Sequence, residues 1–130
     1  MKFSILVYGS PTASQASATA YRFTKAAIDK GHDIYRIFFY GDGVLNASSL
    51  NAPPQDESDL CQQWQQLGLQ HDIDMVVCIA AALKRGILDP GEAKRFEKQA
   101  SNLAPGFNLS GLGQMMDATQ QSDRLITFGY

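Results

Sequence analysis

The chain has 130 residues, of which 45% are hydrophobic and 18% are charged, and this composition is typical of a globular protein with one core. Its formal net charge is −2 and its basic residues are scattered, which argues against direct nucleic-acid binding because that needs a basic face. The apolar start of the chain is too short to span a membrane and lacks a signal-peptide cleavage pattern. We therefore expect a cytoplasmic protein with one domain over residues 1–130.

Strand and helix patterns alternate along the chain. Ala16, Ala20, Phe23 and Ala27 recur at helical spacing, and Gly31 follows where a helix ends. The predicted elements are a strand over 3–8, a helix over 14–30, a strand over 33–40, a loop over 44–55, a helix over 56–69, a strand over 73–78, a helix that starts at Asp89, a short strand over 107–109, a helix from Ser110 to about 121, and a strand over 124–128. Alternation of this kind predicts parallel βαβ units. The expected fold class is α/β, a three-layer α/β/α sandwich with a mainly parallel sheet of about five strands, whose order the pattern leaves open.

Capping signals predict where two of the helices begin. Asp56 is expected to cap the helix that carries Cys61 and Trp64 on its apolar face, and Gly68 is expected to end it. Asp89 precedes a proline and a glutamate at the spacing of a helix start. The inward-facing residues expected for that second helix are Ala93, Phe96 and Ala100.

Cys78 is the first candidate for chemistry, because it ends a short apolar run that reads as a buried strand. Open parallel sheets place their chemistry at the carboxyl ends of the strands. Lys84 and Arg85 follow within one or two helical turns, and nearby positive charge favours the reactive thiolate. We predict that this basic pair activates the thiolate or docks a partner. The alternative is that Cys78 is only a core residue.

A parallel topology sorts the polar residues by the end of the sheet at which they lie. The residues predicted to line a crevice with Cys78 are Ser10, Tyr40, Asp42, Ser110 and Gly111, because each follows a strand. Both histidines, His32 and His71, precede strands and so belong to the opposite end, roughly 20 Å away. A Cys–His hydrolase site therefore has no base here.

Two further features have competing interpretations. Cys61 shares a helix face with Leu60, Trp64 and Leu67, where a free cysteine behaves as a small buried hydrophobe. The hydroxyl-rich loop over 9–14 is able to hold a phosphate, as in a flavodoxin-like flavin or small-ligand module. Helix capping and a tight turn explain the same loop more simply. The two cysteines match neither a disulfide framework nor a metal site, so no metal is expected.

The chain resembles the DsrE-like sulfur-relay family, most closely its TusD branch, over nearly its whole length. The specific block is 78–86, a cysteine followed by isoleucine, three alanines, leucine, a basic pair and glycine. Supporting blocks are 38–47, 64–67 and 109–113. The family's sulfur-carrying cysteine falls on Cys78, and Lys84 stands where arginine is usual.

The resemblance implies a sulfurtransferase that carries sulfur as a persulfide on Cys78 in the 2-thiolation of the tRNA wobble uridine. It implies a hetero-oligomer with TusB-like and TusC-like subunits, a TusA-like donor and a TusE-like acceptor, with no cofactor and no direct contact with nucleic acid. A non-catalytic structural subunit remains a further alternative. We also expect the loop over 40–47 to line the crevice near a neighbouring subunit, because Val44, Leu45 and Ala47 are apolar; the alternative is that they fold back onto their own domain.

Overall fold

A computed structural model describes residues 1–129. Its elements in chain order are β1 (Lys2–Val7), α1 (Ala16–Asp29), β2 (Asp33–Phe39), the 3-10 helix η1 (Gly41–Ala47), α2 (Leu60–His71), β3 (Asp74–Cys78), α3 (Ile79–Leu83), α4 (Pro90–Arg95), β4 (Phe107–Ser110), α5 (Gly113–Gln121) and β5 (Arg124–Phe128). None of the helices in this range is long and apolar enough to cross a membrane.

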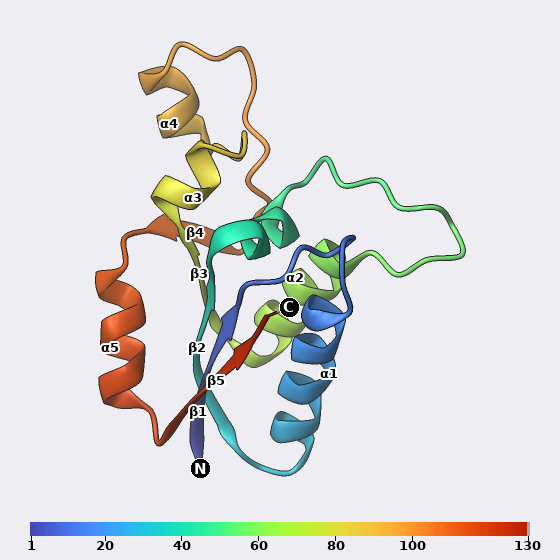
Figure 1. Cartoon of the computed structure of the whole chain (residues 1–130), viewed down its shortest axis with the longest axis vertical. Helices are drawn as coiled ribbons and strands as arrows, with labels where there is room; N and C mark the ends of the chain where they lie inside the picture. Colours follow the sequence, from blue (N-terminus) through green and yellow to red (C-terminus); the bar gives the residue numbers. More distant parts are fainter. Residues whose placement is uncertain (130) are drawn as a thin grey trace.

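The five strands form one parallel sheet in the order β4-β3-β2-β1-β5. Helices α1 and α2 cover one face of the sheet and α5 covers the other, so the predicted three-layer α/β sandwich is confirmed (Figure 1). Helices α3 and α4 lie beyond the carboxyl end of β3 and project from the body of the protein (Figure 1). Parallel strands bring the segments that follow β2, β3 and β4 to one edge of the sheet, and this edge positions the candidate site.

The core lies between the sheet and the pair α1 and α2. Ile5, Ile37 and Phe39 are fully buried on the central strands. Trp64 of α2 is also fully buried, and its ring meets that of Phe39 edge-on with centroids 5.4 Å apart. Edge-to-face aromatic pairs stabilise a packed core beyond their burial alone. This packing fixes α2 against the middle of the sheet.

Helix α2 begins and ends later than its sequence pattern predicts. The cap is Asp59 rather than Asp56: its side chain accepts a hydrogen bond from the Gln62 N–H over 3.1 Å. Gly68 lies inside the helix, which continues to His71. A Cβ at Gly68 would lie 2.6 Å from the terminal methyl of Met75, so this glycine permits close packing of α2 on β3. A packing requirement, not a helix end, therefore explains Gly68.

Two predictions for the later helices are also wrong. Ser110 does not cap α5, because it is the last residue of β4 and α5 begins at Gly113. In α4, Asp89 is the cap as predicted and Ala93 is buried, but Phe96 is 47% exposed and Ala100 is also exposed. The helix ends at Arg95, one turn earlier than an inward stripe through Ala100 requires. Phe96 therefore stands on the surface.

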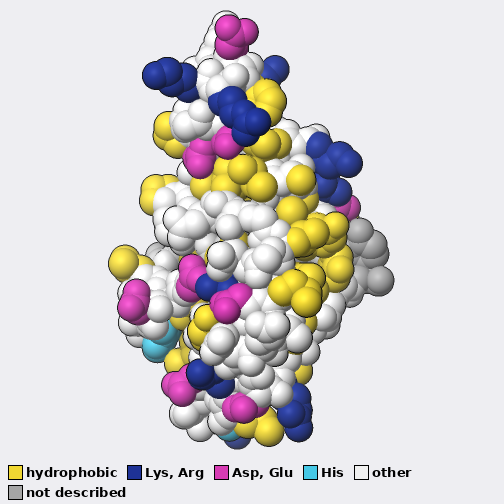
Figure 2. Space-filling view, turned by 90° about the vertical axis from the view of Figure 1, so that its left-hand side faces the viewer, with side chains coloured by type: hydrophobic (Ala, Val, Ile, Leu, Met, Phe, Trp, Pro, Cys, Tyr) yellow, Lys and Arg dark blue, Asp and Glu magenta, His cyan; other side chains and the backbone are white. Residues whose placement is uncertain are grey.

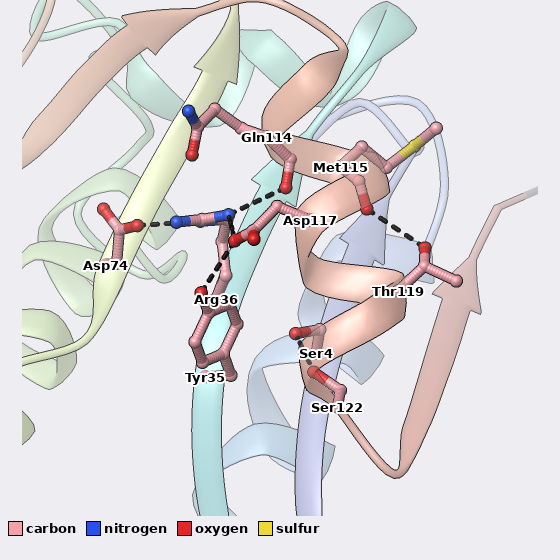
Figure 3. Close-up of polar contacts among 9 residues, drawn as sticks. All are labelled: Ser4, Tyr35, Arg36, Asp74, Gln114, Met115, Asp117, Thr119 and Ser122. Atoms are coloured by element: carbon pink, nitrogen blue, oxygen red, sulfur yellow. Dashed lines mark hydrogen bonds and ion pairs between the residues drawn. The ribbon is translucent and has the colours of Figure 1, made fainter.

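Helix α5 is held on the sheet by a polar cluster around Arg36 of β2 (Figure 3). The Arg36 guanidinium lies 2.7 Å from the Asp74 carboxylate and 2.9 Å from that of Asp117, and it donates to the Gln114 carbonyl over 2.8 Å. The Tyr35 hydroxyl donates to the same Asp117 oxygen over 2.7 Å. A register shift opposite β1 at this point lets two successive residues of β2 reach α5. Charge pairing thus adds to the apolar contacts of α5, which include Met115 against the core and the buried Ala118.

Candidate functional site

Cys78 lies at the junction of β3 and α3. It is the last residue of the strand and directly precedes the helix. Its backbone is extended, with φ −59° and ψ 118°, and its side chain makes no capping hydrogen bond. The residue is 3% exposed. The sulfur is therefore largely shielded from solvent in this conformation.

Ser110 is brought beside Cys78, as the sequence predicts for two strand ends. The two residues face each other across the β3–β4 pair. Side chains alternate along a strand, so Cys78 shares a face with Val76 and Asp74, opposite to Met75, which packs on α2. Cys78 and Ser110 therefore lie on the face that α5 covers. Gly111 follows one residue later and is exposed.

Arg85 is held by Asp42, another of the predicted site residues. Its Nε lies 2.9 Å from the Asp42 carboxylate, and Nη1 donates to the Ala81 carbonyl over 3.1 Å. The pair joins η1 to the end of α3, so it braces the helix that starts at Cys78. Asp42 offsets the positive charge of Arg85, while Lys84 is exposed and has no carboxylate within 4.0 Å among residues 1–129.

Tyr40 and Ser10 lie farther along the same edge of the sheet. Tyr40 follows β2, the strand next to β3, and its ring meets that of Tyr8 edge-on at 5.4 Å. Ser10 follows β1, which β2 separates from β3. Its hydroxyl contacts Thr12 at the backbone N–H over 3.2 Å and at the hydroxyl over 3.1 Å. The sheet thus brings Ser110, Tyr40, Asp42 and Arg85 around the end of β3 and leaves Ser10 two strands away.

The apolar residues that follow β2 lie elsewhere than predicted. They belong to η1, and Val44 and Ala47 are both fully buried in the core of their own chain. Leu45 is half-buried and packs against the same core. The prediction that a partner covers these apolar residues is therefore wrong for Val44 and Ala47, which fold back onto their own domain.

Asn46 is a positioning residue that the sequence analysis did not single out. It is fully buried, and its amide donates to the Gly43 carbonyl and to the Ser17 hydroxyl, each over 2.9 Å. A longer contact of 3.4 Å reaches the Gly9 carbonyl. Asn46 thus ties η1 to the first loop and to α1. The signal available in the sequence was its place in the 38–47 block of the family resemblance.

Cys61 differs from Cys78 in its surroundings more than in its exposure. It is 5% exposed, and its neighbours on the buried face of α2 are Trp64 and Leu67. Burial, with a smaller effect of the Asp59 charge, raises the pKa of the Cys61 thiol to about 11. The Cys61 thiol is therefore almost entirely protonated at pH 7, which makes Cys61 a poor nucleophile.

The first loop uses its hydroxyls within its own turn. Ser10 bonds to Thr12, and the Ser14 hydroxyl accepts from the Ala16 N–H over 3.3 Å at the start of α1. These contacts fit the simpler interpretation of the loop, a turn that leads into a helix. A surface groove of about 900 Å³ runs beside it, lined by α1 and by the long segment that precedes α2.

Comparison with known proteins decides the family. The DsrE/DsrF-like family matches residues 1–128. The chain belongs to this family. A protein named "Putative sulfurtransferase DsrE" from Allochromatium vinosum is 51% identical over 99% of both chains. One named "Sulfurtransferase TusD" from Yersinia pestis is 46% identical over 98% of both.

The solved structure of the ychN protein from E. coli shares the fold, with a TM-score of 0.79 and 18% identity over 98% of this chain and 99% of that one. The family predicted from the 78–86 block is therefore confirmed, and so is the prediction of a sulfurtransferase, the activity named for both relatives. In this chain, the block begins at Cys78, the cysteine that ends β3.

Proposed function

We propose that this chain is the sulfur-carrying subunit of a persulfide relay, with Cys78 as the carrier. The observation that carries the proposal is the position of Cys78 at the carboxyl end of β3, in a chain that belongs to the DsrE/DsrF-like family. Residues 1–130 form a single sulfur-carrier domain in this proposal, and the protein works in the cytoplasm.

The transfer step is a thiol exchange. The Cys78 thiolate attacks the outer sulfur of a donor persulfide, a new S–S bond forms on Cys78, and the donor's S–S bond breaks. The electron pair of the broken bond leaves on the inner sulfur of the donor, which departs as a thiolate. An acceptor thiolate then attacks the outer sulfur on Cys78 in the same way. Each step is redox-neutral, so one cysteine suffices and no cofactor is required.

The basic pair and the polar neighbours have separate roles in this proposal. Lys84, exposed and without a carboxylate partner among residues 1–129, supplies positive charge for the thiolate or for an acidic partner. Arg85, paired with Asp42, positions α3. Tyr40, Ser110 and Gly111 line the approach to Cys78.

Replacing Lys84 by alanine tests whether its positive charge contributes to the reactivity of the Cys78 thiol. Alkylation of Cys78 at pH 7 should slow several-fold, because in this proposal Lys84 supplies the positive charge that favours the thiolate. The matched control is Lys30→Ala at the end of α1, which should alkylate at the wild-type rate. Equal rates in Lys84→Ala and wild type would contradict a role of Lys84 in activating the thiolate.

We further propose that the relay serves 2-thiolation of the tRNA wobble uridine, with TusA-like donor and TusE-like acceptor proteins and with TusB-like and TusC-like subunits in a hetero-oligomer. Half-buried Ile79 and Leu83 on α3, and Leu112, which is 46% exposed after β4, support such an assembly. Apolar side chains gather between the projecting helices and the body (Figure 2). A subunit seated there would shield a persulfide from stray thiols.

Complementation tests this downstream role. In a bacterium lacking TusD, the chain expressed with its partner subunits should restore 2-thiouridine in tRNA, measured by mass spectrometry of nucleosides. The second candidate, a relay that feeds a different acceptor, is favoured by the relative named DsrE at 51% identity. Persulfide on Cys78 without restored 2-thiouridine would support that candidate.

A further inference from the structure

The segment 84–103 forms an arm that projects beyond the carboxyl end of β3 (Figure 1). Asn102 closes its base: its backbone N–H donates to the Leu88 carbonyl over 2.9 Å, and its side-chain oxygen accepts from the Leu88 N–H over 3.0 Å. The Asn102 amide also donates to the Gly86 carbonyl over 3.0 Å. A bridge between Ser48 and Leu103 ties the returning chain to the body. The arm is therefore a pinned structure with a defined direction.

The tip of the arm, defined as residues 94–98, is basic and carries an exposed aromatic ring. Lys94, Arg95 and Lys98 outnumber Glu97 there, and all five residues of the tip are exposed. Phe96 is 47% exposed, with the Arg95 guanidinium 5.2 Å from its ring centroid. Among residues 1–129, neither lysine of the tip has a carboxylate within 4.0 Å. Basic side chains lie on several sides of the end of the arm, and an acidic side chain stands at its top (Figure 2).

These features fit a transient protein partner better than the other occupants of such a surface. A permanent subunit interface is predominantly apolar, whereas three of the five residues at the tip carry positive charge. Nucleic-acid binders neutralise many phosphates with an extended basic face, and this chain has a net charge of −2. A small basic patch around one aromatic residue suits an acidic protein surface that binds and leaves quickly.

We propose that the tip of the arm docks an acidic surface of the protein that accepts sulfur from Cys78. The inference rests on the proposed persulfide relay. A persulfide on Cys78 is open to attack by any thiol that reaches it, so the correct acceptor must be selected when sulfur is transferred from Cys78. The arm starts directly after α3, which follows Cys78, so the docking tip and the sulfur site belong to one continuous stretch of chain on the same side of the sheet.

The test compares two charge-reversed variants, each assembled with its partner subunits. Lys94→Glu with Lys98→Glu reverses the tip, and Lys25→Glu with Lys30→Glu is the matched control, because both of its lysines are exposed on or beside α1. Cys78 is loaded with radiolabelled sulfur, and its discharge is followed to the TusE-like acceptor and, separately, to dithiothreitol. Binding of the acceptor to the Cys78→Ser form of each variant is measured by titration calorimetry.

For the tip variant we expect discharge to the acceptor to slow by about tenfold or more at low salt, with a matching rise in Kd. Discharge to dithiothreitol should stay at the wild-type rate, and added salt should slow wild type more than the variant. Unchanged binding and discharge to the acceptor would overturn the proposal. So would an equal loss in the control variant, or a failure of the tip variant to assemble with its partner subunits. Absence of labelled sulfur on wild-type Cys78 would instead count against the relay, and the calorimetry would still test the docking.

Discussion

Replacing Cys78 by serine should abolish sulfur transfer and leave the fold intact. A hydroxyl does not accept a sulfane sulfur under these conditions, so incubation with a cysteine desulfurase relay should add no sulfur to the variant. The fold should persist because serine is nearly isosteric and position 78 precedes α3, where serine is a favoured cap. We expect the free energy of unfolding to change by less than about 1 kcal/mol. Intact-mass spectrometry and a thermal melt measure both effects.

The matched control is Cys61→Ser. It should retain transfer at the wild-type rate, because burial keeps the Cys61 thiol protonated at neutral pH. In wild type, the gain of one sulfur should map to a peptide that contains Cys78. Retained transfer in Cys78→Ser, or a persulfide on Cys61, would contradict the proposed carrier. It would then favour the alternative in which Cys78 is only a core residue.

Local patterns in the sequence were enough to predict the fold class, because strands and helices alternate so regularly. The strand order was not predictable, since it depends on contacts between residues far apart in the chain. The error at α2 has a local cause: Asp56 and Asp59 both have the residue type of a cap, and only the path of the preceding loop selects Asp59. The prediction that Gly68 ends α2 failed for a related reason. Gly68 makes room for Met75 of β3, a contact between two elements that the local pattern does not show.

The positions of candidate site residues were predictable where the sheet topology alone determines them. The pairing of side chains from distant parts of the chain was not. Cys78 and Ser110 end neighbouring strands, and a parallel sheet brings them together. The pairing of Arg85 with Asp42 could not be read from the sequence, because 43 positions separate the two residues. The burial of Val44 in its own core was likewise hidden, since an apolar residue after a strand suits a domain core and an interface equally.

Replacing Arg36 by alanine should destabilise the protein by roughly 2–3 kcal/mol, the largest loss of stability that we expect from a residue outside the core. The Arg36 side chain is 10% exposed, and its removal leaves Asp74 and Asp117 without their common partner. Both carboxylates are about 40% exposed, at 43% and 40%, so water partly compensates them and the loss falls below that of a fully buried pair. The melting temperature should fall by about 10 °C.

The control is Arg124→Ala on β5, an exposed arginine that donates to the Asp123 carbonyl, which should melt within a few degrees of wild type. If Arg36→Ala had the same melting temperature as Arg124→Ala, α5 would be held on the sheet by its apolar contacts and not by the polar cluster around Arg36. Loss of helical circular dichroism before the main transition in Arg36→Ala would identify α5 as the segment released. Sulfur transfer to dithiothreitol should survive below the melting temperature, because Arg36 pairs with Asp74 at the opposite end of β3 from Cys78.

The same cluster gives stability a defined dependence on pH through Asp117. Its hydrogen bond from Tyr35, together with the hydrogen bond and the positive charge of Arg36, lowers the pKa of the Asp117 carboxyl in the folded state. A carboxyl with a lowered folded pKa stabilises the fold above its unfolded pKa of about 3.9, and this contribution is lost as pH falls through the folded value. The difference in melting temperature between wild type and Asp117→Asn should therefore be largest near pH 7 and shrink below about pH 4. A difference that stayed constant down to pH 3 would mean that asparagine loses shape or hydrogen bonding rather than charge, and that the ionised carboxylate is not what fastens α5 to the sheet.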